Sequence, residues 1–275
     1  MSKQSKGLKR NTIDKYYTKE SVAKECIELV KKYIPINNND IIIEPSAGSG
    51  VFIPYIKLLT NNWYFYDIEP EHPEIILQDY LLFAMKEIES SQKIHVIGNP
   101  PFGRQSSIAI KFIKKSCEFA NSISFILPKS FKKESLKRAF PLHFHLVYEI
   151  DIPFNSFLVN NSEHDVPCVF QVWQKRDTLR ETVLKQEPQG FEFVKKMDEP
   201  KPDISFRRVG VNAGKIDTDL EKSEQSHYFI RFTNNKPLDE NIQNILKIKY
   251  EFNNTVGQKS ISKQELIKEF INVLY

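Results

Sequence analysis

The chain has 275 residues, of which 40% are hydrophobic, and its formal net charge is only +4. This length and composition are sufficient for a full core, either as one large domain or as a domain with an appendage. Three widely separated cysteines exclude a disulfide framework, no metal-ligand spacing is present, and no apolar run could cross a bilayer or act as a signal peptide. We therefore expect an intracellular, cytoplasmic protein (nuclear if the source is eukaryotic) without a metal site.

The first 13 residues are polar and basic and predict a flexible tail. Residues 14–18 (Asp-Lys-Tyr-Tyr-Thr) then lead into an amphipathic helix. Thr18 is the expected N-cap of that helix. Its apolar positions recur at helical spacing: Val22, Ala23, Cys26, Ile27, Val30 and Tyr33.

Residues 41–50 combine an apolar strand (41–44) with a loop of small residues (45–50), and residues 51–59 predict a helix. Small residues let the backbone approach a ligand closely, and glycine permits positive φ. The N-terminus of a helix supplies unpaired N–H groups to an anionic group. A P-loop is excluded because no Gly-Lys-Ser/Thr follows, and the full dinucleotide glycine pattern is missing.

Two acidic residues follow the glycine loop. Asp67 ends a predicted strand (63–67), where a carboxylate is suited to accept hydrogen bonds from ribose hydroxyls. Asp79 precedes a predicted helix over residues 80–90, so it could equally be a helix N-cap.

Residues 99–102, Asn-Pro-Pro-Phe, follow a short β-branched strand (94–98). Ligands bind at the carboxyl edge of an open α/β sheet. The two prolines stiffen the loop and remove backbone donors, while Asn99 adds an acceptor and Phe102 a flat apolar face. Such a site suits the exocyclic amine of adenine or cytosine taken out of its stack.

Further strands are predicted over residues 122–127, 144–150 and 168–173, with a helix over residues 106–120 between the strand 94–98 and the first of them. This alternation favours an α/β fold with a mostly parallel sheet, which the last two strands close as an antiparallel hairpin. Lysines after the Asn-Pro-Pro-Phe loop and after residue 127 form a possible phosphate-binding rim, or else solvated helix faces. They are Lys111, Lys114, Lys115, Lys129, Lys132, Lys133 and Lys137, with Arg138 beside them.

After residue 175 the composition changes, which predicts a small α+β extension over residues 176–275. Strands are expected at residues 204–210 and 226–232, and a final helix, capped by Ser262, at residues 263–274. Arg207 and Arg208 could contact phosphates, although a surface hairpin explains them equally well.

The order of these motifs resembles that of the S-adenosylmethionine-dependent N6-adenine methyltransferases, in the arrangement that places the cofactor motif before the Asn-Pro-Pro-Phe motif. The resemblance covers residues 14–175. It implies a Rossmann-like class I methyltransferase fold with a seven-stranded sheet, S-adenosylmethionine as the cofactor, and methyl transfer to the N6 amine of adenine in nucleic acid, DNA rather than RNA.

The resemblance also implies roles for individual residues. The catalytic motif comprises Asn99, Pro100, Pro101 and Phe102. The cofactor would contact Tyr17, Thr18, Glu44, Pro45, Ser46, Gly48, Gly50, Phe52, Asp67, Asp79 and Asn99. The target base would stack on Phe102 and on either Phe154 or Phe157, with a plug under the hairpin as the alternative role for one of these two. Their positive charge, and not the resemblance, makes Lys132, Lys133, Arg207 and Arg208 candidate contacts to the nucleic-acid strand.

Three interpretations remain open on the sequence. The first is a nucleic-acid N6-adenine methyltransferase, and the second is the same chemistry on RNA or on a protein glutamine. The third is a binding module with the same fold but without catalysis, against which the intact residues 99–102 and the glycine loop argue.

Overall fold

The structure is a computed structural model that describes residues 15–84, 92–182, 184–250 and 259–274. The chain forms two compact units, Met1–Thr182 and Val183–Tyr275, and each is described by itself. No helix in these ranges is long and apolar enough to cross a membrane. The predicted basic tail, residues 1–13, lies outside the described residues.

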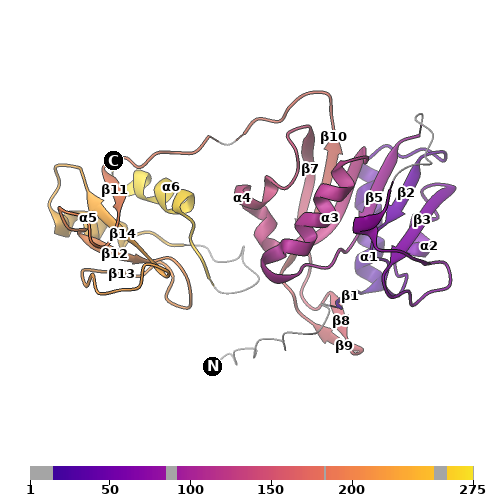
Figure 1. The fold of residues 1–275 in the computed structure, drawn as a ribbon, viewed down its shortest axis with the longest axis horizontal. Helices are drawn as coiled ribbons and strands as arrows, with labels where there is room; N and C mark the ends of the chain where they lie inside the picture. Colours follow the sequence, from indigo (N-terminus) through magenta and orange to yellow (C-terminus); the bar gives the residue numbers. More distant parts are fainter. Residues whose placement is uncertain (1–14, 85–91, 183, 251–258, 275) are drawn as a thin grey trace. The chain divides into compact units, whose positions relative to one another are not determined.

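The first unit is built on a seven-stranded sheet with the order β4-β3-β2-β5-β6-β10-β7 (Figure 1). The strands are β2 (Ile41–Glu44), β3 (Asn62–Asp67), β4 (Ile76–Leu77), β5 (Ile94–Gly98), β6 (Ser122–Pro128), β7 (Phe144–Asp151) and β10 (Cys168–Lys175). Neighbours from β4 to β6 are parallel, while β10 lies antiparallel between β6 and β7. This is the strand order of the class I methyltransferase fold, and it confirms the predicted fold.

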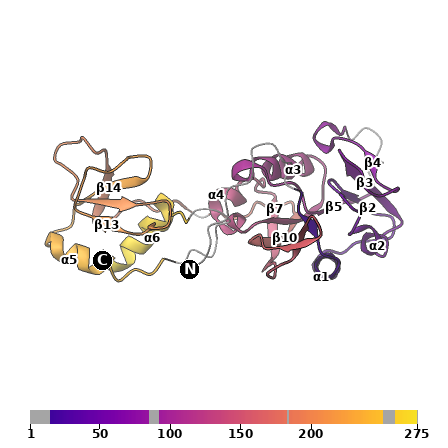
Figure 2. The same cartoon turned by 90° about the horizontal axis from the view of Figure 1, so that it is seen from below.

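Helices cover both faces of this sheet (Figure 2). On one face α1 (Glu20–Tyr33) and the short α2 (Ile53–Ile56) pack on alternate strand residues such as Ile42 and Ile97. On the other face α3 (Ser107–Cys117) packs on the intervening residues, including Val96. The central strands β2, β5 and β6 are buried along their whole length, which explains why they read as largely apolar runs rather than alternating ones.

Four short elements complete the second face and its loops. They are the 3₁₀ turns η1 (Tyr80–Leu82), η2 (Arg104–Ser106) and η3 (Lys129–Lys132), together with the single helical turn α4 (Glu134–Lys137).

Two predicted helices are shorter than expected. Residues 51–59 are helical only over Ile53–Ile56, because the amides of Leu58 and Leu59 bond three residues back instead of four. The helix predicted from residue 80 is only a 3₁₀ turn, since Phe83 is extended and packs its ring 5.2 Å from that of Tyr66. Residues 85–91 of that prediction lie outside the described chain.

A second small sheet joins the start of the described chain to the connection between β7 and β10. It consists of β1 (Tyr17–Thr18), β8 (Phe157–Val159) and β9 (Ser162–His164). Thr18 pairs with Phe157, so the prediction that Thr18 caps α1 is wrong. The N-cap is Lys19, whose backbone N–H donates to Ser156 O at 3.0 Å, and its side chain makes no capping bond.

The second unit has its own antiparallel sheet, with the order β11-β14-β12-β13, and its own core. Its elements are β11 (Phe191–Val194), β12 (Ile204–Arg207), β13 (Ile216–Asp217), β14 (His227–Phe232), α5 (Leu238–Ile245) and α6 (Lys263–Leu274). Ser262 caps α6 as predicted: its Oγ accepts from the Glu265 N–H, and its own N–H donates to the Glu265 carboxylate. The elements β11, β13 and α5 were not predicted from the sequence.

Candidate active site

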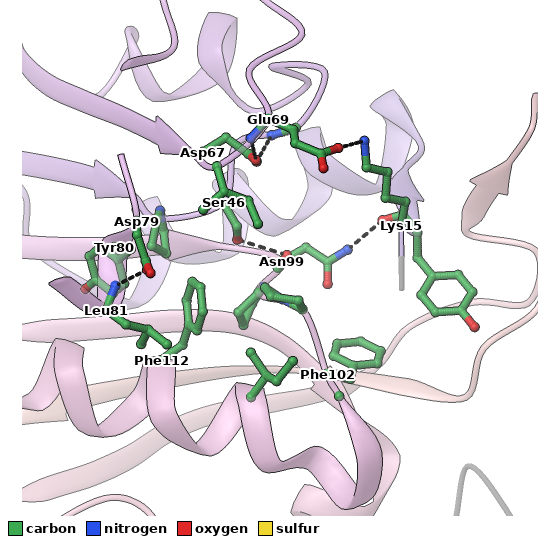
Figure 3. A pocket seen from close by; sticks show the side chains of 18 of the residues that line it. Lys15, Ser46, Asp67, Glu69, Asp79, Tyr80, Leu81, Asn99, Phe102 and Phe112 are labelled. Atoms are coloured by element: carbon green, nitrogen blue, oxygen red, sulfur yellow. Dashed lines mark hydrogen bonds and ion pairs between the residues drawn. The ribbon is translucent and has the colours of Figure 1, made fainter. Parts of the chain in front are cut away.

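A cavity of about 470 Å³ opens at the carboxyl ends of β2, β3 and β5 (Figure 3). This volume is in the range of small-molecule and cofactor sites. Many of the residues predicted from the sequence line it: Tyr17, Pro45, Ser46, Gly48, Asp67, Asp79, Asn99, Pro100, Pro101 and Phe102. Parallel strands bring their carboxyl ends to one edge, which is why motifs far apart in sequence meet here.

The glycine loop is held against the end of β3. Gly48 has a φ of +53°, a conformation that glycine adopts without cost, and its N–H donates to Asp67 Oδ2 at 2.8 Å. The other Asp67 oxygen accepts from the Glu69 N–H at 2.9 Å. A Cβ at position 48 would lie 3.6 Å from the Tyr17 ring, so this ring rests directly on the loop.

Asn99 is fixed in orientation by two hydrogen bonds. Its Nδ2 donates to the Tyr16 carbonyl and to Thr18 Oγ1, both at 3.1 Å. A carbonyl can only accept, so the amide nitrogen must face Tyr16 and the oxygen must point the other way. That oxygen, Oδ1, is buried and has no hydrogen-bond partner among the described residues. Figure 3 shows Asn99 between Ser46 and Phe102.

Glu44 lies beneath the cavity and does not line it. Its side chain is 1% exposed, and its Oε2 has no hydrogen-bond partner in the described part of the chain. Burial, and secondarily the charge of Asp67, raises the pKa of Glu44 well above its ordinary value. A Cβ at Gly98 would lie 3.3 Å from the Glu44 side chain, so the small residue preceding Asn99 leaves room for this carboxyl group.

Charged side chains meet at one border of the cavity. Lys15 Nζ lies 2.5 Å from a Glu69 carboxylate oxygen and 3.3 Å from Glu71, and the Tyr17 hydroxyl donates to Glu71 at 2.5 Å. The hydrogen bond from Tyr17, assisted by Lys15, lowers the pKa of Glu71. These contacts tie residues 15–17 to the segment that follows β3.

Asp79 caps the 3₁₀ turn η1, because its Oδ1 accepts from the Leu81 N–H at 2.9 Å. The N-cap alternative is therefore correct, and the same side chain also lines the cavity. Its contact with a cofactor stays a prediction.

Several lining residues were missed as site residues: Lys15, Tyr16, Ile68, Glu69, Glu71, Tyr80, Leu81, Gly103, Arg104, Ile108 and Phe112. A signal existed for some of them, since Ile68 directly follows Asp67 and Tyr16 belongs to the same short motif as Tyr17. The α3 residues Ile108 and Phe112 carry no such signal, because only packing directs them toward the cavity.

Besides Thr18, Glu44 and the basic residues discussed below, four further predicted contact residues do not line the cavity. Gly50 is required by packing, since a Cβ there would lie 2.8 Å from Ile53. Phe52 is 1% exposed and belongs to the core beneath the glycine loop. Phe154 is 85% exposed, whereas Phe157 is completely buried. The plug alternative therefore applies to Phe157, because β8 turns this ring into the core, and of the two candidates only Phe154 keeps an exposed ring.

The predicted phosphate-binding lysines are largely paired with carboxylates. Lys129 and Lys132 lie 2.8 and 2.5 Å from Asp151 at the end of β7, and Lys137 lies 3.7 Å from Glu149. Partial burial opposes ionisation of Asp151, but hydrogen bonds from the two lysines outweigh it and lower its pKa. The rim therefore carries less positive charge than the sequence suggests; Lys133 also has a partner.

The two arginines of the second unit also have partners. Arg207 Nε donates to the Val209 carbonyl at 2.9 Å, and Arg208 donates to the Gln225 carbonyl at 2.8 Å. The Arg208 guanidinium lies 5.5 Å from the Tyr228 ring centroid. Their predicted phosphate contacts are neither required nor excluded by these bonds. In the described ranges, no cluster of three or more His, Cys, Asp or Glu could hold a metal ion.

No family model matches the chain. The Ribosomal RNA small subunit methyltransferase A of Francisella tularensis subsp. novicida is 29% identical over 125 residues, which cover 40% of this chain and 46% of that protein. The chain thus spans less than half the length of this curated relative.

Two solved structures illustrate the similarity at the level of coordinates. The type I restriction-modification methyltransferase subunit from Streptococcus thermophilus has a TM-score of 0.44 at 15% identity, over 59% of this chain and 45% of that one. The N-methyltransferase NodS from Bradyrhizobium japonicum, in complex with S-adenosyl-L-homocysteine, has a TM-score of 0.42 at 9% identity, over 57% and 87%. The fold assignment rests on the strand order of the first unit.

Proposed function

We propose that this protein is an S-adenosylmethionine-dependent methyltransferase that acts on the N6 amine of adenine in nucleic acid, with DNA as the first substrate class. The observation that carries the proposal is the Oδ1 of Asn99, which is buried and has no hydrogen-bond partner in the part of the chain that the structure describes. Leaving a buried acceptor unpaired costs about 1–3 kcal/mol, and an amine N–H donor entering the cavity would remove this cost.

The residues around the cavity suit the cofactor. The glycine loop offers a close backbone approach, and its Gly48 packs under Tyr17. Asp67 stands at the end of β3, where an acid can accept from ribose hydroxyls, and Asp79 stands on the same cavity wall. Ile68 and Leu81 also line the cavity and offer apolar surface to a planar ring. S-adenosylmethionine, when bound here, would supply an electrophilic methyl group.

The chain's own residues would then prepare the target amine. An adenine amine is a poor nucleophile because its lone pair is delocalised into the ring. Acceptance of its N–H groups by Asn99 Oδ1 and the Pro100 carbonyl would favour a tetrahedral nitrogen and stabilise the positive charge that develops on it. Phe102 would hold the base by stacking. No strong base is needed, because the extra proton can leave to solvent after the transfer.

RNA is the second candidate substrate, favoured by the similarity to a protein named as a ribosomal RNA methyltransferase. The chemistry at Asn99 would be the same. The phosphate contacts predicted for Lys132, Lys133, Arg207 and Arg208 would serve either nucleic acid.

The test is transfer of a tritiated methyl group from S-adenosylmethionine to duplex DNA, single-stranded DNA, structured RNA and protein, followed by nucleoside analysis. We expect N6-methyladenine in at least one nucleic acid, and about 10²–10³-fold slower formation of it with the Asn99→Ala variant. Label found only in protein, or on another position of a base, would refute the proposal. So would full activity of Asn99→Ala.

A further inference from the structure

The tandem tyrosines at positions 16 and 17 lie on different sides of the cavity. Tyr17 rests on the glycine loop and donates to Glu71. Tyr16 instead lies against Phe102, with a ring centroid separation of 6.4 Å. Alternation of side chains along an extended segment explains the division. One tyrosine therefore belongs to the side of the predicted cofactor, and the other to the side of the Asn-Pro-Pro-Phe motif.

The rings of Tyr16 and Phe102 have the spacing of a slot for a planar ligand. They are 26° from parallel, and both residues line the cavity. Successive bases in a stack are about 3.4 Å apart, so a base inserted between two rings needs a separation of about 6.8 Å. The observed centroid separation of 6.4 Å lies within a few tenths of an ångström of this value.

Tyr16 is supported from its surroundings. The His164 ring, from β9, stacks on it at 5.5 Å and 21°, and the Phe157 ring meets it edge-on at 6.4 Å. The connection between β7 and β10 thus acts on the slot indirectly, through rings that pack on Tyr16. Its buried Phe157 cannot itself present a face to a ligand.

The slot is also linked to the amide that would bind the amine. The backbone carbonyl of Tyr16 accepts from Asn99 Nδ2 at 3.1 Å, which directs the Asn99 Oδ1 away from Tyr16 and leaves it unpartnered. A planar ring held between Tyr16 and Phe102 would therefore lie beside a fixed acceptor, the arrangement that an aromatic amine requires.

We propose that Tyr16 and Phe102 are the two walls of the slot that receives the target adenine, with its amine toward Asn99 Oδ1. This inference rests on the proposed function and deepens it in two ways. It assigns the second stacking residue to Tyr16 rather than to Phe154 or Phe157. It also requires a base that is out of its stack, so unpaired or mismatched adenine should bind better than adenine in a perfect duplex.

The experiment compares Tyr16→Leu and Tyr16→Phe with the matched pair Tyr17→Leu and Tyr17→Phe. For each variant, calorimetry gives the affinity for S-adenosylmethionine, and methyl transfer gives KM and kcat on an adenine-containing single strand of the best nucleic-acid class. Quenching of a 2-aminopurine oligonucleotide reports stacking without requiring turnover. Stacking on an aromatic side chain contributes roughly 1–3 kcal/mol per base, so we expect Tyr16→Leu to weaken strand binding about tenfold or more.

We expect the leucine variants of Tyr16 and Tyr17 to affect different ligands. Tyr16→Leu should raise KM for the strand and reduce quenching at unchanged cofactor affinity, while Tyr16→Phe stays near wild type. Tyr17→Leu should weaken the cofactor instead. Unchanged KM and quenching in Tyr16→Leu, in a protein that still methylates adenine, would refute the slot and leave the proposed function standing. A wild-type protein that neither binds nor methylates any nucleic acid would refute both, and loss of cofactor binding in Tyr16→Leu but not in Tyr16→Phe would assign Tyr16 to the cofactor and overturn the inference.

Discussion

At the scale of single residues, the polarity of one amide determines what the site can bind. The Asn99 Nδ2 donates to Tyr16 and Thr18. Its Oδ1 is buried and has no hydrogen-bond partner within the described ranges. An aspartate at this position would place a second acceptor against the Tyr16 carbonyl, so the neighbours select an amide and not a carboxylate. The site is thus built to receive a donor, not an acceptor.

We expect Asn99→Ala to lower kcat by about 10²–10³-fold, the effect of removing one group that stabilises developing charge, while cofactor affinity is retained. Thr18→Val keeps the amide and removes one of its two anchors, so its loss should be smaller. Single-turnover transfer and calorimetry on the same preparation provide the measurement. Near-normal turnover of Asn99→Ala would remove Asn99 from the mechanism.

Asp67 holds the glycine loop and is predicted to bind ribose. Its carboxylate accepts from the N–H groups of Gly48 and Glu69. Asp67→Ala should raise the Kd for S-adenosylmethionine roughly 10- to 150-fold, since hydrogen bonds to a charged group contribute about 1.5–3 kcal/mol. Asp67→Asn, which keeps one acceptor, should be intermediate. A Kd unchanged in titration calorimetry would place the ribose elsewhere.

At the scale of elements, the ends of β6 and β7 are joined by ion pairs that reduce the charge available to phosphates. Asp151 at the end of β7 lies against Lys129 and Lys132 at η3, and Glu149 lies against Lys137. The carboxylates of β7 thus lie beside the lysines that follow β6. The basic segment that the sequence suggests is therefore partly neutralised by its neighbouring strand.

The salt dependence of nucleic-acid affinity should show this neutralisation. Each phosphate contact contributes about 0.9 to the logarithmic salt slope on duplex DNA and about 0.7 on a single strand. Replacing Lys132, Lys133 and Lys137 by Gln should reduce the salt slope by less than the contribution of three phosphate contacts. Asp151→Asn should make the slope steeper. Fluorescence anisotropy across a salt series measures both. If neither substitution alters the slope, the binding face lies elsewhere.

β5 and β6 are also joined by a buried histidine. His95 is 2% exposed; its Nδ1 lies 2.7 Å from Ser122 Oγ, and its Nε2 lies 3.4 Å from Asp40. Burial lowers the pKa of His95 below its ordinary value of about 6.5, although Asp40 opposes the shift. The unfolded chain therefore binds this proton more readily than the folded one.

The free energy of unfolding should consequently lose nothing to His95 above about pH 6.5. It should fall as the pH decreases below that value toward the pKa of His95 in the folded state. His95→Gln removes the titration and should flatten this part of the profile, even if it lowers stability at pH 7.5. Urea unfolding at pH 7.5, 6.5 and 5.5 measures the free energy of unfolding of both proteins, and the wild-type value minus the variant value is compared across the three pH values. A difference that does not change with pH would contradict the assignment.

At the scale of the whole molecule, the chain contains separate cores. The two clusters of the first unit cover the two faces of its sheet, and the ten buried residues of the third cluster all belong to the second unit. All described cavity-lining residues, from Lys15 to Phe112, belong to the first unit. Chemistry and any contribution of the second unit should thus be separable.

A chain shortened after Thr182 should still fold and bind S-adenosylmethionine with wild-type affinity. If the second unit contributes phosphate contacts through Arg207 and Arg208, the shortened chain should lose affinity for nucleic acid. Calorimetry and anisotropy on both proteins decide this, with Arg207→Gln/Arg208→Gln in the full chain as the control. Loss of cofactor binding on shortening would show that the units depend on each other.

The sequence by itself determined six of the seven strands of the central sheet, the order of the motifs and the wall of the cavity that these motifs form; the edge strand β4 was not predicted. Strands such as β2 and β5 are rich in isoleucine and valine, and such runs specify buried parallel strands locally. Because parallel strands end at one edge, Ser46, Asp67 and Asn99 could be placed together without coordinates. The capping of α6 was equally local.

Only the tertiary structure decided the contacts between distant segments. Thr18 pairs with Phe157 in a strand, and that pairing replaces its predicted cap and buries the phenylalanine. Asp151 forms ion pairs with Lys129 and Lys132, which follow β6. Contacts between segments that are not consecutive in the sequence, such as these, have no periodic signal in either segment, and the free energy that favours them exists only once the sheet has formed. For that reason the facing rings of Tyr16 and Phe102 could be found only in the folded chain.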